Sequence, residues 1–92
     1  MTNQTNNQTI EETAKGYLKM VIKNCLANDR KVNPCDISDE EVENVYETNS
    51  LPGYRIHQAK LTGYVNGKEK ISIVVALIDI ETEEWYYSQS IN

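Results

Sequence analysis

The sequence has no Phe, a single His and a single Trp, and its four glycines are isolated from one another. It also lacks any run of about 18 apolar residues, which argues against a membrane-spanning helix. One His leaves only one candidate base for nucleophilic catalysis, and isolated glycines form no phosphate-binding loop. These absences favour a protein that is not an enzyme and does not bind a membrane.

Cysteine is nearly as scarce. Cys25 and Cys35 are the only two, too few for a secreted domain held by disulfides, so free thiols are expected. A local bridge between them stays an alternative. There is no Cys-x-x-Cys pair, and neither a metal site nor another cofactor is expected. Because the chain starts without the basic and apolar stretches of a secretory signal, a cytoplasmic location is predicted.

Basic residues are outnumbered, with nine Lys and Arg against fourteen Asp and Glu, and the formal net charge is -5 over 92 residues. This length predicts a flexible polar tail over residues 1–8 and one small domain over 9–92. The acids gather in two segments, 36–47 and 79–84, neither of which contains Lys or Arg. Such segments repel DNA and RNA and attract basic protein surfaces, so direct nucleic-acid binding is not expected.

The first predicted element is an amphipathic helix over 10–27. Thr9 and Glu12 have the spacing of a capping box, in which each side chain satisfies a free backbone N–H of the first turn. Apolar residues then recur every three or four positions, which places them on one helix face. The polar pair Asn28-Asp29 is predicted to end this helix.

A second, shorter helix is predicted over 39–47. Ser38 and Glu41 repeat the capping-box spacing, and a narrow apolar stripe follows. The acids of the first turn favour a helix because of its dipole. An edge strand over the same residues stays the alternative.

From residue 54 onward the pattern is typical of strands. Asn66-Gly67 is a strong hairpin signal, because both central positions of a type I′ turn need positive φ. It predicts two paired strands over 54–65 and 68–80. A third strand over 85–91 follows the second acidic segment.

The predicted registers, with Trp85 opposite Ile80, divide the sheet into two faces. One is interpreted as the core face that the long helix covers. His57 lies on this face opposite Ala76 and is interpreted as a half-buried histidine rather than a catalytic one. The predicted members of this face are Ala59, Leu61, Val65, Val74, Ala76, Ile78, Ile80, Trp85, Tyr87 and Ile91.

The opposite face is apolar too, although an antiparallel sheet usually leaves one face polar and wet. Only the short helix remains to cover it, so either that helix folds over this strip or the strip contacts a partner or a second copy. An odd-length loop at 81–84 would add Trp85 and Tyr87 to the strip and remove Tyr86 from it. The candidate apolar contacts are Tyr54, Ile56, Tyr64, Ile71, Ile73, Val75, Leu77 and Tyr86.

Together these elements predict an α+β fold. An N-terminal amphipathic helix packs on a three-stranded antiparallel meander, with the short helix or edge strand between them. In outline this resembles cystatin-like and nuclear-transport-factor-like small domains. The resemblance spans roughly residues 9–91 and depends on no motif, so it implies no function.

The acidic segments and nearby aromatic residues favour a small inhibitor that binds a basic, nucleic-acid-binding surface of a host protein. Phage anti-CRISPR and other anti-defence proteins resemble the chain in size and charge. Its frequent Asn, Ile and Lys and rare Arg are compatible with a low-GC bacterium, its phages or plasmids. The candidate acidic contacts are Asp36, Asp39, Glu40, Glu41, Glu43, Glu47, Glu81, Glu83 and Glu84.

The alternative function is a structural or assembly subunit. In this hypothesis the acids only keep the protein in solution. The apolar strip would then form a homodimer or dock on a larger complex.

Overall fold

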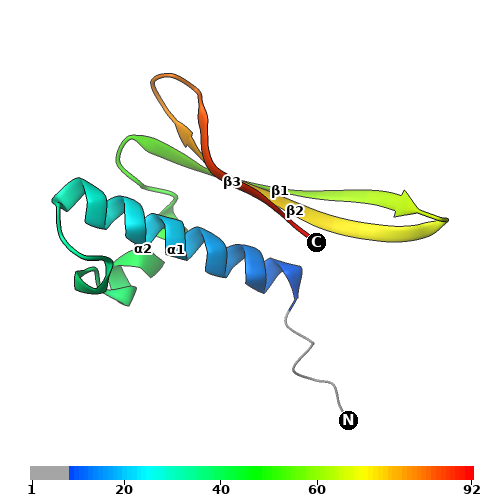
Figure 1. The fold of residues 1–92 in the computed structure, drawn as a ribbon, viewed down its shortest axis with the longest axis horizontal. Coiled ribbons are helices and arrows are strands. Elements are labelled where there is room, and N and C mark those ends of the chain that lie inside the picture. The colour runs from blue at the N-terminus through cyan, green and yellow to red at the C-terminus, as the bar shows by residue number, and fades with distance from the viewer. Residues whose placement is uncertain (1–8) are drawn as a thin grey trace, which may run out of the picture.

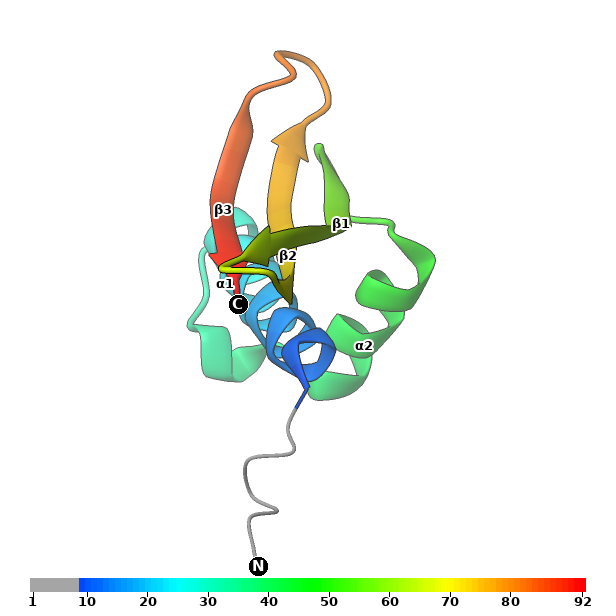
Figure 2. The same cartoon turned by 90° about the vertical axis from the view of Figure 1, so that its right-hand side faces the viewer.

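A computed structural model describes residues 9–92, and the tail predicted for residues 1–8 lies outside them. An antiparallel sheet of order β1-β2-β3 has both α-helices on one side (Figures 1 and 2). The predicted α+β fold is confirmed, and the second element is a helix rather than a strand. In chain order the elements are α1 (Ile10–Arg30), the 3-10 turn η2 (Pro34–Asp36), α2 (Asp39–Thr48), β1 (Tyr54–Val65), β2 (Lys68–Asp79) and β3 (Trp85–Ile91).

The start of α1 is the predicted capping box. The backbone N–H of Glu12 donates to the Thr9 hydroxyl oxygen, and that of Thr9 donates to the Glu12 carboxylate, both at 3.1 Å. The predicted end at Asn28-Asp29 was wrong, because both residues stay helical. The helix ends where Lys31 turns left-handed with φ 61°.

Helix α2 is fixed at both ends by side chains. The Ser38 hydroxyl accepts a hydrogen bond from the backbone N–H of Glu41 at 3.1 Å. At the other end Asn49 adopts a left-handed conformation with φ 54°. Its amide oxygen accepts from the Ile56 N–H at 2.9 Å, and its amide nitrogen donates to the Ile56 carbonyl at 3.4 Å. Asn49 thereby joins the end of α2 to the edge of β1.

The β1–β2 hairpin has the predicted turn and register. Asn66 and Gly67 have φ of 54° and 79°, as the two central positions of a type I′ turn require. Tyr54 pairs with Asp79. Turn chemistry alone was enough to set this pairing.

The predicted register of β3 was wrong. Trp85 pairs with Ile78, two residues from its predicted partner. The register then shifts at an irregularity between Val75 and Leu77, and Tyr87 on β3 has φ 53°. A bulge of this kind changes the face on which the following residues lie. Ile91 consequently pairs with Ile73.

The choice of core face was also wrong. Helix α1 packs on the side that carries Ile73, Val75 and Leu77, none of which is more than 1% exposed. Both faces of β2 are apolar, so alternation could not distinguish them, and the face with the longer aliphatic side chains has the larger area to bury. The predicted core face is therefore the outer face of the sheet. Its members Leu61 and Ile80 are 52% and 62% exposed.

Candidate partner-binding surface

The first acidic segment is largely paired with α1. Glu43 forms ion pairs with Lys19 and, at 3.8 Å, with Lys15. Asp39 lies 3.3 Å from Lys23. Helix α2 packs on α1 through Val42 and Val45, and these lysines of α1 reach its acids beside that apolar contact. A count of charges along the sequence assigns these carboxylates to a free acidic patch. In the fold they are paired with lysines of α1.

Two further acids of this segment also have partners within the fold. The guanidinium of Arg30 binds both carboxylate oxygens of Glu41, and Nη1 donates to Oε1 at 2.9 Å. The Asp36 carboxylate accepts from the Asn33 N–H at 3.2 Å. Among residues 9–92, only Glu40 and Glu47 of the predicted acidic contacts in 36–47 have neither an ion pair nor such a structural bond.

The second acidic segment forms a tight turn between β2 and β3, called the acidic turn here (residues 79–84). Asp79 Oδ1 accepts from the backbone N–H groups of Glu81 and Thr82 at 2.8 and 2.9 Å. The hydrogen bond from the Thr82 N–H is the main reason that the pKa of Asp79 lies below its ordinary value. The Asp79 N–H also donates to the Glu84 carbonyl at 2.8 Å, which closes the turn.

Three carboxylates of the acidic turn stay exposed. Within the described part of the chain Glu81, Glu83 and Glu84 form no ion pair. Glu84 accepts from the Tyr86 hydroxyl at 2.9 Å, and this bond raises the pKa of Tyr86. The turn thus holds three negative groups on a fixed backbone.

Apolar side chains lie directly beside the acidic turn on the outer face. Trp85 is 50% exposed, which leaves a large aromatic residue free to act as an anchor in an interface. Its ring contacts that of His57, with centroids 4.8 Å apart. Trp85 pairs with Ile78, which is 4% exposed, and His57 pairs with Ala76, which is 0% exposed. His57 is half-buried and pairs with Ala76, as the sequence predicted.

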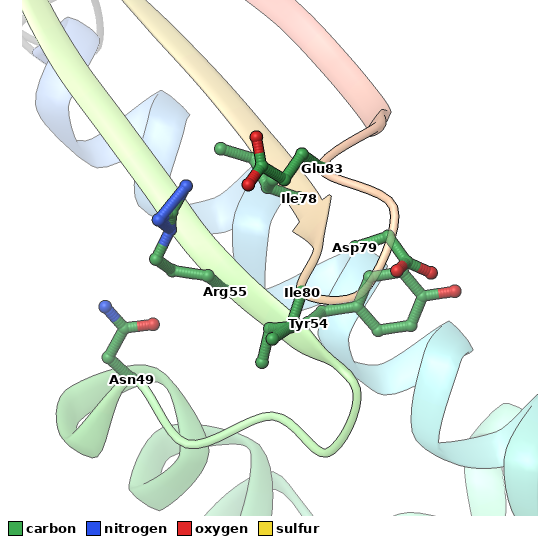
Figure 3. A pocket seen from close by; sticks show the side chains of 7 residues that line it. All are labelled: Asn49, Tyr54, Arg55, Ile78, Asp79, Ile80 and Glu83. Carbon is green, nitrogen blue, oxygen red and sulfur yellow. The ribbon is translucent and has the colours of Figure 1, made fainter.

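A shallow cavity of about 440 Å³ lies at the same end of the hairpin (Figure 3). Arg55 from β1 and Glu83 from the turn bring charges of opposite sign to it. Sequence reasoning missed Arg55, because a single basic residue at the start of a strand gives no motif. The lining residues are Asn49, Tyr54, Arg55, Ile78, Asp79, Ile80 and Glu83.

The predicted apolar contacts do not form one surface. Ile73, Val75 and Leu77 are buried beneath α1, so the prediction that this strip is exposed was wrong. The half-buried members are Tyr54, Ile56 and Ile71. The Tyr54 and Tyr86 rings pack edge to face with centroids 6.0 Å apart. The exposed members are Tyr86, at 39%, and Tyr64, at 72%, which lies far along the hairpin.

Cys25 and Cys35 are both free thiols. Burial raises the pKa of the half-buried Cys25 thiol. No group of three or more His, Cys, Asp or Glu in residues 9–92 is placed to hold a metal ion. The helices of this described region are too short or too polar to cross a membrane.

Comparison with protein-family models, curated proteins and solved structures found no match to the chain. The resemblance in outline to cystatin-like and nuclear-transport-factor-like domains therefore stays a prediction. What the protein does has to be inferred from its own surface.

Acid is expected to loosen α2 from α1. Hydrogen bonds from Arg30 and Lys19 hold the pKa values of Glu41 and Glu43 below the ordinary value of 4.5. A depressed pKa in the folded state adds stability at neutral pH, and this is lost as the pH falls through the folded-state value. We expect the urea midpoint to fall steeply below about pH 4.5.

The matched variant is Glu41→Gln/Glu43→Gln, which removes both titrating groups and keeps their size. Its urea midpoint is expected to be lower than that of the wild type at pH 7 and to fall less on acidification. Equal losses in the two proteins between pH 7 and 3 would show that these pairs do not carry the effect.

Proposed function

We propose that this chain is a non-enzymatic protein-binding module that occupies a basic, nucleic-acid-binding surface of another protein. The acidic turn and the neighbouring outer face make the contact. One observation carries the proposal: exposed carboxylates and an exposed Trp85 lie side by side on a turn whose backbone is held by Asp79.

Electrostatics favours the acidic turn over α2 as the contact. The carboxylates of Glu81, Glu83 and Glu84 need give up no ion pair within residues 9–92 before they meet Arg or Lys of a partner. The paired carboxylates of α2, on Asp39, Glu41 and Glu43, would have to exchange one partner for another. Carboxylates held on a fixed turn compete with phosphates for the same basic side chains, and charge complementarity speeds their encounter.

The apolar side chains supply the part of the contact that excludes water. Ile80 within the acidic turn and Trp85 directly after it are 62% and 50% exposed. A large aromatic anchor surrounded by charged groups is a common arrangement at the centre of an interface. This combination supports specific protein binding rather than a surface that only keeps the chain in solution.

Capture from a low-GC bacterial lysate tests the proposal. The immobilised full chain is expected to retain basic nucleic-acid-binding proteins at roughly 50 mM salt and to lose them toward 500 mM, because salt screens exposed charges. Added duplex DNA is expected to release them. Trp85→Ala is expected to lower the captured amount at every salt concentration.

Two charge-matched variants locate the contact. Glu81→Gln/Glu83→Gln removes two charges from the acidic turn, and Glu40→Gln/Glu47→Gln removes two from α2. Only the first is expected to reduce capture strongly. Equal losses in both variants, or no basic protein retained at low salt, would refute the proposal.

A further inference from the structure

The outer edge of β1 carries backbone groups without partners. In an antiparallel pair, alternate residues direct their N–H and C=O groups toward the neighbouring strand and the others direct them away. Asn49 bonds the outward groups of Ile56, and the Tyr54 N–H donates outward to the Leu51 carbonyl at 3.0 Å. The even-numbered residues of β1 therefore face away from β2. Within residues 9–92, no hydrogen bond is made to the outward backbone groups of Gln58, Lys60, Thr62 and Tyr64.

These four residues lie on a projecting part of the sheet, called the hairpin arm here (residues 58–72). The β1–β2 hairpin runs past the N-terminal end of α1 and past the end of β3 (Figure 1). Toward the β1–β2 turn, the last residue of β2 that pairs with β3 is Ile73. Every residue from 60 to 70 is exposed. A two-stranded hairpin is marginally stable in water, and native proteins usually protect such edges. The arm has the form of a sheet that lacks a strand.

We propose that the missing strand is β1 of a second copy of this chain, paired antiparallel about Leu61. This register places Gln58 opposite Tyr64 of the second copy, and Lys60 opposite Thr62. The outward backbone groups of these four residues in each copy then have hydrogen-bond partners. Four pairs with two backbone bonds each join the two sheets, as in other isologous dimers with a two-fold axis.

Neighbouring registers fit less well. Centring the pair on Lys60 would set two lysines directly opposite each other, which is unfavourable. It would also bring Tyr64 against Ile56, whose edge Asn49 already occupies. Centring it on Thr62 would leave Gln58 without a strand partner. The open segment is thus complementary to itself in one register.

Two further features favour the second copy. An edge lysine usually discourages pairing, but the Lys60 ammonium lies 2.9 Å from the Glu11 carboxylate of its own α1. Leu61, 52% exposed in the single chain, would pack against Leu61 of the second copy. The acidic turn lies at the opposite end of the hairpin, so this proposal does not depend on the proposed function.

Sedimentation of the full chain tests the dimer. At roughly 100 μM the wild type is expected to sediment as a dimer. Thr62→Pro removes an outward N–H and no bond to β2, and edge strands accept proline. We expect it to weaken the dimer at least about tenfold while its circular dichroism spectrum stays that of the wild type.

Cysteine cross-linking tests the register independently of Thr62→Pro. In a Cys25→Ser/Cys35→Ser background, Leu61→Cys places two thiols across a non-hydrogen-bonded pair with Cα atoms about 4.5 Å apart. Rapid disulfide formation under mild oxidation is expected. Val65→Cys is the matched control, because Val65 is 54% exposed on the same arm but would face His57 of the second copy.

The outcomes separate the alternatives. A dimer that cross-links through Leu61→Cys and not through Val65→Cys supports the proposal. A wild type that stays monomeric at this concentration overturns it, and so does a dimer in which both cysteines react at the same rate. A dimer that Thr62→Pro leaves intact in a folded protein would place the contact elsewhere.

Discussion

Replacing Val75 by Glu is expected to unfold the domain at neutral pH. Val75 lies in the middle of β2 and is fully buried on the face of the sheet that α1 covers. A carboxylate there would have no partner, because the structure contains no buried polar side chain among residues 9–92. The expected loss is roughly 4–5 kcal/mol, close to the whole stability of a small domain at the lower end of the usual range of about 5–15 kcal/mol.

Circular dichroism and urea unfolding measure this effect. Val65→Glu is the control, because Val65 lies in the same hairpin and is 54% exposed. It is expected to change the stability by no more than about 0.5 kcal/mol. A folded Val75→Glu protein that only loses self-association would instead restore the sequence-based hypothesis that this strip is an exposed interface.

Leu18→Ala is expected to cost about 3 kcal/mol, within the range measured for large-to-small changes in cores. Leu18 is fully buried and lies at the centre of the face that α1 turns toward the sheet. The substitution removes apolar contacts and leaves a cavity, while alanine itself favours the helix. The expected fall in Tm is roughly 12–24 °C for a domain of this size.

Met20→Ala provides the comparison within the same helix. Met20 is 52% exposed, so its replacement is expected to change the Tm by no more than a few degrees. Thermal unfolding followed by circular dichroism measures both variants. Similar losses at the two positions would contradict the assignment of the buried face of α1.

Local signals in the sequence were reliable wherever a few neighbouring residues decide the conformation. Thr9 and Glu12 satisfied each other's backbone N–H groups, as their spacing predicted. Asn66 and Gly67 took the positive φ angles that fix the hairpin register. Such devices depend on side chains within three or four positions, so they can be recognised before the fold is known.

Signals that depend on distant packing were not reliable. Both faces of β2 carry aliphatic residues, so the alternation of side chains along the strand did not indicate which face is the core. The bulge that carries Tyr87 at φ 53° moved Ile91 to the opposite face. The exposure of Trp85 beside the acidic turn followed from the first of these two events, the choice of core face, because Trp85 pairs with Ile78 ahead of the bulge. Neither event has a signature in the local sequence.

The sequence by itself determined the first helix, the three strands, their order and the hairpin turn, because these follow from backbone propensities and short-range hydrogen bonds. Only the tertiary structure decided which charges and apolar residues stay exposed. Packing α2 on α1 paired Glu41 and Glu43 with basic side chains, and covering Val75 with α1 removed the predicted interface. Charge pairing and burial are properties of groups that meet in space, and their separation along the chain does not reveal which groups will meet.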